Sequence, residues 1–213
     1  MRRTPVAFAV FARAPRAGRV KSRLIPKLGA WRAARLHARL LEHALRAARA
    51  ARCGPLELHC APHARDRFLL RCAARFGASL HVQRGRDLGE RMARAFQGGL
   101  RRHRALILIG SDCPALGARE LRRAARALIG GAQAVISPAE DGGYALIGLR
   151  RMDSRLFRDV VWGADDVYRR TSLALDRLGW RWRALATVWD VDRSADYERL
   201  RESGLLLKRG RSS

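Results

Sequence analysis

The stretch Ala105-Leu106-Ile107-Leu108-Ile109-Gly110-Ser111-Asp112-Cys113-Pro114 runs from five consecutive apolar residues into a glycine and a single carboxylate. An apolar run of this length is typical of a strand that is buried on both faces of a parallel sheet. The carboxyl ends of such strands form the edge at which open α/β sheets bind their ligands. The sequence therefore predicts that Asp112 lies at a binding site.

Acidic residues are scarce in this chain, which has 19 Asp and Glu against 44 Lys and Arg among 213 residues. Two further acidic groups, Glu140-Asp141 and Asp190-Val191-Asp192, also lie beside strand-like apolar runs. Carboxylate oxygens are ligands that Mg²⁺ prefers in proteins. Three acidic groups at strand ends together indicate one metal-assisted site for a phosphorylated substrate.

The rest of the chain alternates between strand-like and helix-like segments. Short apolar runs predict strands over 6–11, 56–60, 79–83, 105–109, 134–137, 144–149 and 183–188. Apolar stripes at helical spacing predict helices over 30–52, 63–76, 87–100, 118–129, 165–178 and 194–202. This order implies crossover connections and a mostly parallel sheet. We expect a single α/β domain over residues 1–205, a three-layer α/β/α sandwich with a mostly parallel mixed sheet, followed by a disordered basic tail over 206–213.

The net charge of +25 raises the question of nucleic-acid binding, because basic surfaces gain affinity by releasing counterions from phosphates. The positive residues are nearly all arginines, however, and are spread along the whole chain. Neither zinc-finger spacing nor a strand pattern of aromatic and basic residues is present. We therefore expect no specific nucleic-acid partner. A non-catalytic basic protein that binds nucleic acid is kept as an alternative to an enzyme.

Cysteines and apolar runs bear on the compartment. The four cysteines show neither a Cys-x-x-Cys pair nor a disulfide framework, which agrees with a reducing compartment. No apolar run is long enough to span a bilayer, and the run over 6–12 is at the minimum length for a secretory signal. We therefore expect a cytoplasmic protein without a membrane span.

A basic, glycine-containing loop follows the first predicted strand and reads Gly18-Arg19-Val20-Lys21-Ser22-Arg23-Leu24. A glycine allows the backbone to approach a phosphate closely, and nearby cations neutralise its charge. The loop lacks the Gly-Lys-Ser/Thr junction of a Walker A motif. We predict that this loop binds phosphate, and the candidate binding residues are Arg13, Gly18, Lys21 and Arg23.

Each acid in these groups has a functional and a structural interpretation. Asp112 is either a Mg²⁺ ligand or a turn residue, and Cys113 beside it is either a nucleophile or a small buried residue. Asp190 and Asp192 alternate across one residue, so that in a strand both would project to the same face. Either of them can be the second metal ligand, while the other caps the last helix or closes a turn.

The segment Asp141-Gly142-Gly143-Tyr144 places a carboxylate before two glycines and an aromatic residue. The simplest interpretation is a hairpin turn, because glycine readily adopts the positive φ that such turns require. The alternative is an acceptor pocket, in which the glycines admit a sugar or phosphate close to the backbone and Asp141 binds hydroxyls or acts as a base. The residues alone leave both interpretations open.

Six segments, taken in order, resemble one known family. They are Phe11-Ala12-Arg13-Ala14-Pro15, the loop from Gly18 to Leu24, Asp87-Leu88-Gly89-Glu90-Arg91-Met92, Gly110-Ser111-Asp112-Cys113-Pro114, Asp141-Gly142-Gly143-Tyr144 and Asp190-Val191-Asp192. The family is that of the glycosyltransferase-A-like, radical-SAM/selenodomain-associated transferases, some of which are linked to arsenosugar biosynthesis. The resemblance covers roughly residues 6–200 and implies the nucleotide-diphospho-sugar transferase (GT-A) fold, which also includes molybdenum-cofactor and 2-phospholactate guanylyltransferases.

The resemblance implies that the basic loop holds a nucleotide's phosphates and that Asp112 binds a divalent metal, Mg²⁺ or Mn²⁺. Asp190 or Asp192 would complete the coordination of this metal. The acceptor side would be lined by Gly142, Gly143 and Tyr144. One departure concerns the acids, because many glycosyltransferases of this fold carry an Asp-x-Asp pair where this chain has Asp112-Cys113-Pro114.

We therefore expect a metal-dependent transferase whose partners are a nucleotide or nucleotide sugar and a small-molecule acceptor, with Asp112 and Asp141 as catalytic residues. The leading hypothesis is a glycosyltransferase that uses a nucleotide-sugar donor. The alternative is a nucleotidyltransferase that joins a nucleoside triphosphate to a phosphorylated acceptor and releases pyrophosphate, for which the cationic loop is suited. The sequence specifies neither the base, the sugar and the acceptor nor the oligomeric state.

Overall fold

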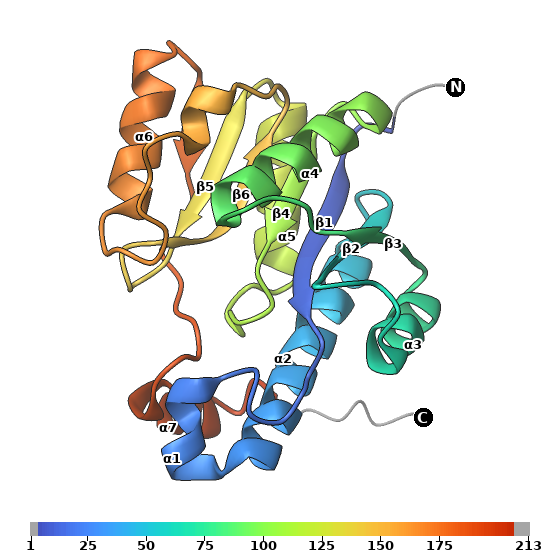
Figure 1. Ribbon diagram of the computed structural model, residues 1–213. Coiled ribbons are helices and arrows are strands. Elements are labelled where there is room, and N and C mark those ends of the chain that lie inside the picture. The colour runs from blue at the N-terminus through green and yellow to red at the C-terminus, as the bar shows by residue number, and fades with distance from the viewer. Residues whose placement is uncertain (1–3, 207–213) are drawn as a thin grey trace.

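The computed structural model describes residues 4–206 (Figure 1). One sheet contains β1 (Ala7–Arg13), β2 (Leu56–Ala61), β3 (Ala78–Val82), β4 (Leu106–Ile109), β5 (Ala134–Pro138), β6 (Tyr144–Leu149) and β7 (Trp182–Ala184). The α-helices are α1 (Ile25–Leu28), α2 (Ala30–Ala51), α3 (Arg67–Phe76), α4 (Leu88–Arg102), α5 (Ala118–Ile129), α6 (Val167–Arg177) and α7 (Ser194–Ser203). Two short 3₁₀ helices are η1 (Ser22–Leu24) and η2 (Ser154–Phe157).

The strands lie in the order β3-β2-β1-β4-β6-β5-β7. β1 pairs in parallel with both β2 and β4, and β2 pairs in parallel with β3. β6 is antiparallel to β4 and β5, whereas β7 is parallel to β5. The sheet is therefore mixed and mostly parallel, which confirms the predicted fold class. Because β1 and β4 are neighbours, the basic loop after β1 and Asp112 after β4 leave the sheet at the same edge.

Helices cover both faces of this sheet (Figure 1). On one face, apolar side chains of α2, α3 and α5 form a core cluster with Val10, Leu58 and Ile107 of the strands. On the other face, α4, η2 and α6 form a second cluster with residues that include Phe11 and Leu108. Successive strand residues enter different clusters because their side chains point to opposite faces.

A third, smaller cluster joins the segment 24–40 to the segment that leads into and forms α7. Leu24 of η1, Leu40 of α2 and Val191 are buried together with Leu200 of α7. α1 and α7 lie side by side in Figure 1, and residues of the two helices are joined by a salt bridge of 2.5 Å between Lys27 and Glu198. This packing holds the basic loop against the segment that carries Asp190 and Asp192.

Parts of the structure near the site differ from the elements predicted from the sequence. The basic loop expected from Gly18 to Leu24 ends in η1, and α1 follows it directly. The strand expected over 183–188 ends at Ala184, because Pro138 on the neighbouring β5 has no N–H for the ladder. The hydroxyl of Ser137 donates to the carbonyl of Ala186 at 2.7 Å instead. Most of the tail predicted over 206–213 lies outside the described residues.

Side-chain caps explain where the helices begin. Asp66 accepts a hydrogen bond from the N–H of Phe68 at 2.9 Å, so that α3 begins at Arg67 and not at 63. Asp87 accepts from the N–H of Glu90 at 2.8 Å and is the N-cap of α4, which begins at Leu88. Such caps satisfy N–H groups that a first helical turn leaves without partners.

The surroundings of Gly148 on β6 provide a test of the packing. A Cβ on this residue would lie 2.8 Å from Val135 Cγ2, 2.9 Å from Leu128 Cδ1 and 3.1 Å from Ile107 Cγ1. We expect Gly148→Ala to lower the free energy of unfolding by about 1–3 kcal/mol through overpacking, as measured by urea denaturation.

The matched control is Gly98→Ala on α4, where a Cβ would meet only Arg102 Nη1 at 3.7 Å. This change should raise the free energy of unfolding by about 0.5–1 kcal/mol, since alanine favours a helix over glycine. An unaltered stability of Gly148→Ala would show that the neighbouring side chains have room to move apart.

Candidate active site

A cavity of about 310 Å³ lies at the carboxyl end of β4. Three carboxylates from separate parts of the chain line it, namely Asp112 after β4, Asp141 in the turn between β5 and β6, and Asp190 after β7. Much of the remaining lining is apolar or aromatic and includes Phe11, Leu88, Met92, Leu108, Tyr144, Ile147, Trp162 and Val167. The structure thus brings one member of each predicted acidic group to a single cavity with an apolar compartment.

Asp112 is held by two polar contacts. The ammonium of Lys21 lies 2.8 Å from Asp112 Oδ2, and the hydroxyl of Ser111 donates to Oδ1 at 3.2 Å. Desolvation raises the pKa of Asp112, but the charges of Lys21 and His37 and the hydrogen bonds from Lys21 and Ser111 together outweigh it and hold the pKa below its usual value. Asp112 is therefore a carboxylate at neutral pH and attracts a cation.

Lys21 reaches this position from a constrained loop. Its backbone adopts φ +50°, in the left-handed region that a residue with a side chain rarely visits. Its side chain is only 4% exposed, whereas that of Asp112 is 42% exposed. The buried side chains of Val20 and Leu24 anchor the loop on either side. A buried ammonium needs a negative partner, and Asp112 provides it.

His37 is a residue of this site that the sequence analysis missed. This buried side chain on α2 has its Nε2 3.0 Å from the carbonyl oxygen of Arg13 and its Nδ1 3.8 Å from Asp112 Oδ1. Within residues 4–206, Nδ1 has no hydrogen-bond partner, and burial lowers the pKa of the ring. The sequence does contain a signal for it: His37 is a polar residue at a position of the buried, apolar stripe of α2, between Ala33 and Leu40.

Asp190 and Asp192 are separated by the structure. Asp190 lines the cavity, whereas Asp192 lies 2.5 Å from Arg23 in a salt bridge. The expectation that both share a face assumed a strand, but the chain after Val188 is not a strand. The N–H of Val191 donates to the carbonyl of Asp112 at 3.0 Å, which fixes this segment beside β4. Asp190 is therefore the better placed of the two to share a metal with Asp112.

Asp190 also differs from Asp112 in its electrostatics. Desolvation, followed by the proximity of Asp141, raises the pKa of Asp190 to about 6. Two carboxylates that face one cavity repel each other, and a divalent cation between them would relieve the repulsion.

The segment Asp141-Gly142-Gly143-Tyr144 forms the hairpin turn between β5 and β6, and three of its residues, Asp141, Gly143 and Tyr144, line the cavity; a role in binding an acceptor stays a prediction. Asp141 Oδ1 accepts a hydrogen bond from the N–H of Gly143 at 2.9 Å. Gly142 is not among the lining residues. With φ +86°, it packs so closely on Asp165 that a Cβ would lie 1.8 Å from the Asp165 carbonyl oxygen. Gly142 was expected to line an acceptor pocket, but it packs against the segment before α6 instead.

The four predicted phosphate-binding residues occupy different positions. Lys21 reaches the cavity, and Arg23 is engaged with Asp192. Arg13 lines a neighbouring hollow of about 430 Å³. The other residues around this hollow are Ala14, Arg16, Arg19, Val20, Ala61, Pro62 and Arg91. Gly18 has φ +77° and no atoms within 4 Å of a Cβ, so its backbone is open to an approaching group.

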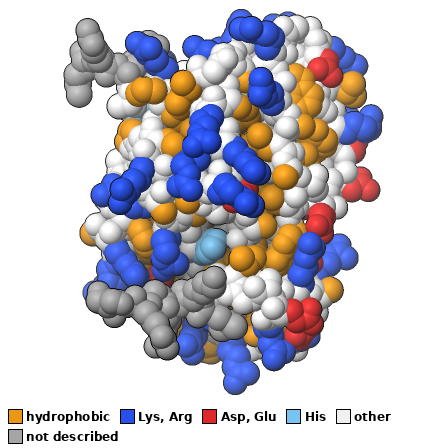
Figure 2. Space-filling view, turned by 180° about the vertical axis from the view of Figure 1, so that it is seen from behind, with side chains coloured by type: hydrophobic (Ala, Val, Ile, Leu, Met, Phe, Trp, Pro, Cys, Tyr) orange, Lys and Arg blue, Asp and Glu red, His pale blue; other side chains and the backbone are white. Residues whose placement is uncertain are grey.

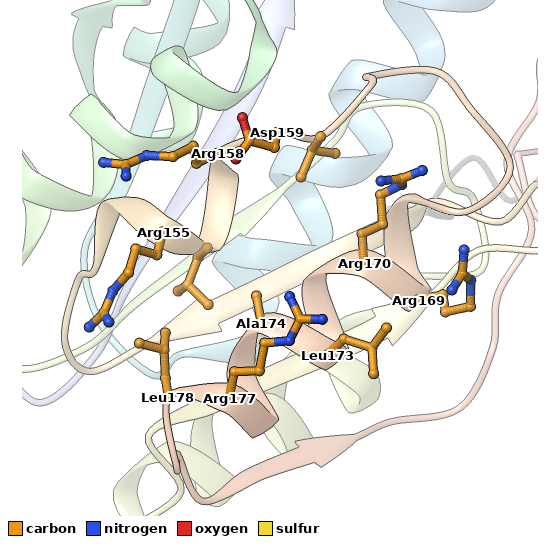
Figure 3. A pocket seen from close by; sticks show the side chains of 11 residues that line it. Arg155, Arg158, Asp159, Arg169, Arg170, Leu173, Ala174, Arg177 and Leu178 are labelled. Carbon is orange, nitrogen blue, oxygen red and sulfur yellow. The ribbon is translucent and has the colours of Figure 1, made fainter.

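A larger cavity of about 550 Å³ lies between η2 and α6 (Figure 3). Its polar lining consists mainly of arginines, and Arg155, Arg169 and Arg170 are paired with Asp153 or Asp166. None of the predicted site residues reaches it.

The sequence also offered Cys113 as a possible nucleophile. Burial raises the pKa of its thiol to about 12, which argues against a nucleophilic thiolate. The cavity at β4 is therefore the candidate active site.

The surface charge follows the spread of arginines in the sequence. Figure 2 shows Lys and Arg side chains distributed over the face opposite to that of Figure 1, among hydrophobic and uncharged ones. Within residues 4–206, no helix combines the length and the apolar character that crossing a membrane requires.

Comparisons with solved structures agree with the fold. The "putative nucleotide-diphospho-sugar transferase" of Desulfovibrio desulfuricans G20 is 30% identical, with a TM-score of 0.85 over 98% of this chain and 91% of that chain. Rv0371c of Mycobacterium tuberculosis H37Rv in complex with manganese is 21% identical, with a TM-score of 0.57 over 94% and 100%. A CMP:2-keto-3-deoxy-manno-octonic acid synthetase complexed with CTP is 11% identical, with a TM-score of 0.56 over 93% and 98%. The latter two share the fold with this chain.

The fold part of the resemblance, the nucleotide-diphospho-sugar transferase type, is thus confirmed, while the narrower family stays a prediction. No curated protein matches the chain. A family model described as "Uncharacterized protein conserved in bacteria (DUF2064)" matches residues 44–164. Since this match spans more than half of the sequence, the chain belongs to the DUF2064 family of bacterial proteins.

Proposed function

We propose that this protein is a metal-dependent transferase of nucleotide-activated substrates, and specifically a glycosyltransferase with a nucleotide-sugar donor. The observation that carries the proposal is the cavity in which Asp112, Asp141 and Asp190 meet, with Lys21 held 2.8 Å from Asp112. Carboxylates beside a buried cation suit a diphosphate and its divalent metal ion. The 30% identical structure, named as a transferase of this kind, supports the same class of reaction.

The donor set fits Mg²⁺ or Mn²⁺. Asp112 and Asp190 would provide carboxylate oxygens, and the ammonium of Lys21 would give up Asp112 Oδ2 when a metal takes this oxygen. The fold relative Rv0371c was crystallised with manganese, which supports this choice. When bound, the ion neutralises charge on the phosphates and on the leaving group.

The chain's own residues divide the remaining work. A phosphate bound in the cavity would offer the ammonium of Lys21 a second anionic partner besides Asp112, and the stem of a lysine is flexible. Arg13 and the arginines around the neighbouring hollow would neutralise the rest of the diphosphate. Asp141 faces the cavity from the hairpin and would bind an acceptor hydroxyl or take its proton.

The apolar compartment favours glycosyl transfer. Tyr144 and Trp162 line the cavity together with Met92 and the three carboxylates. Sugars present hydroxyls at their edges and C–H groups on their faces, so that carboxylates and aromatic rings in one cavity suit a sugar ring. The reactive end of a nucleotide sugar would then lie between the acids and the aromatic side chains.

Nucleotidyl transfer is the second candidate, and the arginine-lined hollow favours it. Arg13, Arg16, Arg19 and Arg91 surround a space of about 430 Å³ at the carboxyl end of β1. A triphosphate carries more charge than a diphosphate sugar and gains more from such an array. This reaction would release pyrophosphate only when the correct acceptor is present.

The first test is thermal stabilisation by nucleoside triphosphates and nucleotide sugars, each with and without Mg²⁺ or Mn²⁺. A ligand at 100 times its Kd should add about 2.7 kcal/mol of stability. We expect a nucleotide sugar to stabilise best and to require the metal, and Asp112→Asn to abolish that metal-dependent gain. Stronger stabilisation by a triphosphate, followed by acceptor-dependent pyrophosphate release, would favour nucleotidyl transfer instead. Metal-dependent binding that survives in Asp112→Asn would remove Asp112 from the metal site.

The Lys21–Asp112 pair allows stability and binding to be separated. Asp112→Asn leaves a buried ammonium without its carboxylate and should lower the free energy of unfolding by about 1–2 kcal/mol, less than for a fully buried pair because Asp112 is partly exposed. In the double variant Lys21→Met/Asp112→Asn, urea denaturation should show most of this loss recovered, while nucleotide binding stays absent. If the double variant regained nucleotide binding as well as stability, the Lys21–Asp112 pair would have only a structural role.

Trp162 provides a test of the apolar compartment. A Cβ on Gly89 would lie 2.7 Å from the Trp162 ring, so the indole is packed against the start of α4. We expect Trp162→Ala to weaken nucleotide-sugar binding by about 10-fold, roughly the loss of one aromatic contact, with nucleoside diphosphate binding unchanged in calorimetric titrations. The control is Trp31→Ala, whose side chain is 79% exposed on α2. Equal weakening for both ligands would place Trp162 outside the sugar compartment.

A further inference from the structure

We propose that Glu57, His59 and His81 form a second metal site, distinct from the candidate active site and selective for a transition metal such as Zn²⁺. Each of the three residues offers one ligand atom, and these atoms lie within 4.8 Å of one another. Two imidazoles and one carboxylate make a ligand set suited to borderline-soft divalent ions. This site is independent of the transferase function proposed above.

The sheet brings the three residues together. Glu57 and His59 lie two positions apart on β2, so their side chains share one face, and His81 on β3 is the direct partner of His59. Leu56, Leu58 and Cys60 point to the opposite face, where they pack against α2, α3 and α5. The site therefore lies on the face that carries α4, at the edge of the parallel half of the sheet.

The two oxygens of Glu57 have different partners. Oε1 accepts hydrogen bonds from Arg102 Nη2 at 2.7 Å and Nε at 3.2 Å, and lies 3.1 Å from His103 Nε2. Oε2 lies 2.9 Å from His59 Nε2 and 3.9 Å from His81 Nε2. One oxygen thus fixes the orientation of the carboxylate, and the other faces two imidazole nitrogens. Outer contacts of this kind orient the ligands of protein metal sites.

Further contacts hold the ligands and their supports in place. The rings of His59 and His81 stack with their centroids 4.8 Å apart, and Phe11 stacks on His59 at 5.5 Å. His103, which supports Glu57, has its Nδ1 2.5 Å from the hydroxyl of Thr4. Ligand atoms that share one ion each lie about 2 Å from it. Two such atoms are at most about 4 Å apart, and the separations of 2.9 and 3.9 Å between Glu57 Oε2 and the two imidazole nitrogens satisfy this condition.

Exposure provides a route for the ion. Glu57 and His59 are buried, whereas the side chain of His81 is 30% exposed. An ion would enter on the side of His81 and retain a water as its fourth ligand there. It would replace the proton between His59 Nε2 and Glu57 Oε2, with the proton of the neutral ring on Nδ1 instead.

The charge around the site determines which metal it favours. Glu57 contributes one negative charge, which Arg102 already balances at Oε1. Mg²⁺ gains little from such a site, because it prefers several oxygen ligands and holds its water tightly. Zn²⁺ and Co²⁺ bind imidazole nitrogen well, so that two histidines can compensate for the weak net charge.

The test is a titration of the metal-free full chain with Co²⁺, followed by visible absorption. We expect d–d bands that saturate at one equivalent, vanish on addition of one equivalent of Zn²⁺, and persist with excess Mg²⁺. His81→Ala should weaken Co²⁺ binding by more than the ~10–100-fold typical of a lost outer contact. Because His81 is partly exposed, this variant should fold, which circular dichroism would verify.

Two control variants separate the sites. His63→Ala removes a histidine in the segment after β2 and should leave the Co²⁺ bands unchanged, and Asp112→Asn should also retain them. Bands that are absent in the wild type, or unaltered in His81→Ala, would overturn the proposal and leave the cluster as a charge network around Glu57. Bands lost in Asp112→Asn would assign the cobalt to the candidate active site and would also overturn it.

Discussion

The contact between the ammonium of Lys21 and the carboxylate of Asp112 is the interaction on which the site depends. It joins the loop after β1 to the end of β4, and it places a cation where the chain is nearly closed to solvent. A buried ammonium is stable only beside its carboxylate, so the loop must be packed in one position. The cluster of Leu24, Leu40, Val191 and Leu200 provides that packing and draws α7 and Asp190 to the same edge. The loop before η1 and the segment before α7, which are far apart in the sequence, therefore complete a site that is centred on the middle strands.

The antiparallel strand β6 explains why the hairpin reaches this edge. β6 lies between β4 and β5 and runs opposite to both, with Ile109 at the end of β4 paired to Leu146 near the start of β6. Asp141, which precedes β6, and Tyr144, its first residue, therefore lie beside the carboxyl end of β4. A parallel strand at this position would have placed its own beginning at the far edge. The one reversed strand thus supplies the site with a carboxylate and an aromatic wall.

Much of the fold could be predicted because it follows from local patterns. The run ending at Asp112 specified a central strand, and the order of strands and helices specified a layered sheet. Properties that depend on distant contacts could not be read in this way. Asp190 and Asp192 part because Asp192 pairs with Arg23, from the other end of the sequence, while Asp190 faces the cavity, and Gly142 leaves the cavity because Asp165 approaches it. The contact of His37 with Asp112, and that of His81 with Glu57 and His59, likewise join separate segments of the chain, which local spacing does not specify.

The excess of positive charge bears on how each acid would bind a metal. At Glu57 the competing cation is Arg102, which engages Oε1 and leaves Oε2 facing the histidines, so metal and arginine need not exclude each other. At Asp112 the competitor is Lys21, which holds the oxygen Oδ2 itself. A metal that takes this oxygen displaces a buried ammonium, which then requires another anion. On the proposed function, the phosphates of the nucleotide are that anion. The metal takes Asp112 from Lys21, and the nucleotide's phosphates give Lys21 a new anionic partner. Likewise, the phosphates take Lys21 from Asp112, and the metal gives Asp112 a new cationic partner. Metal and nucleotide would therefore bind together more favourably than either binds alone.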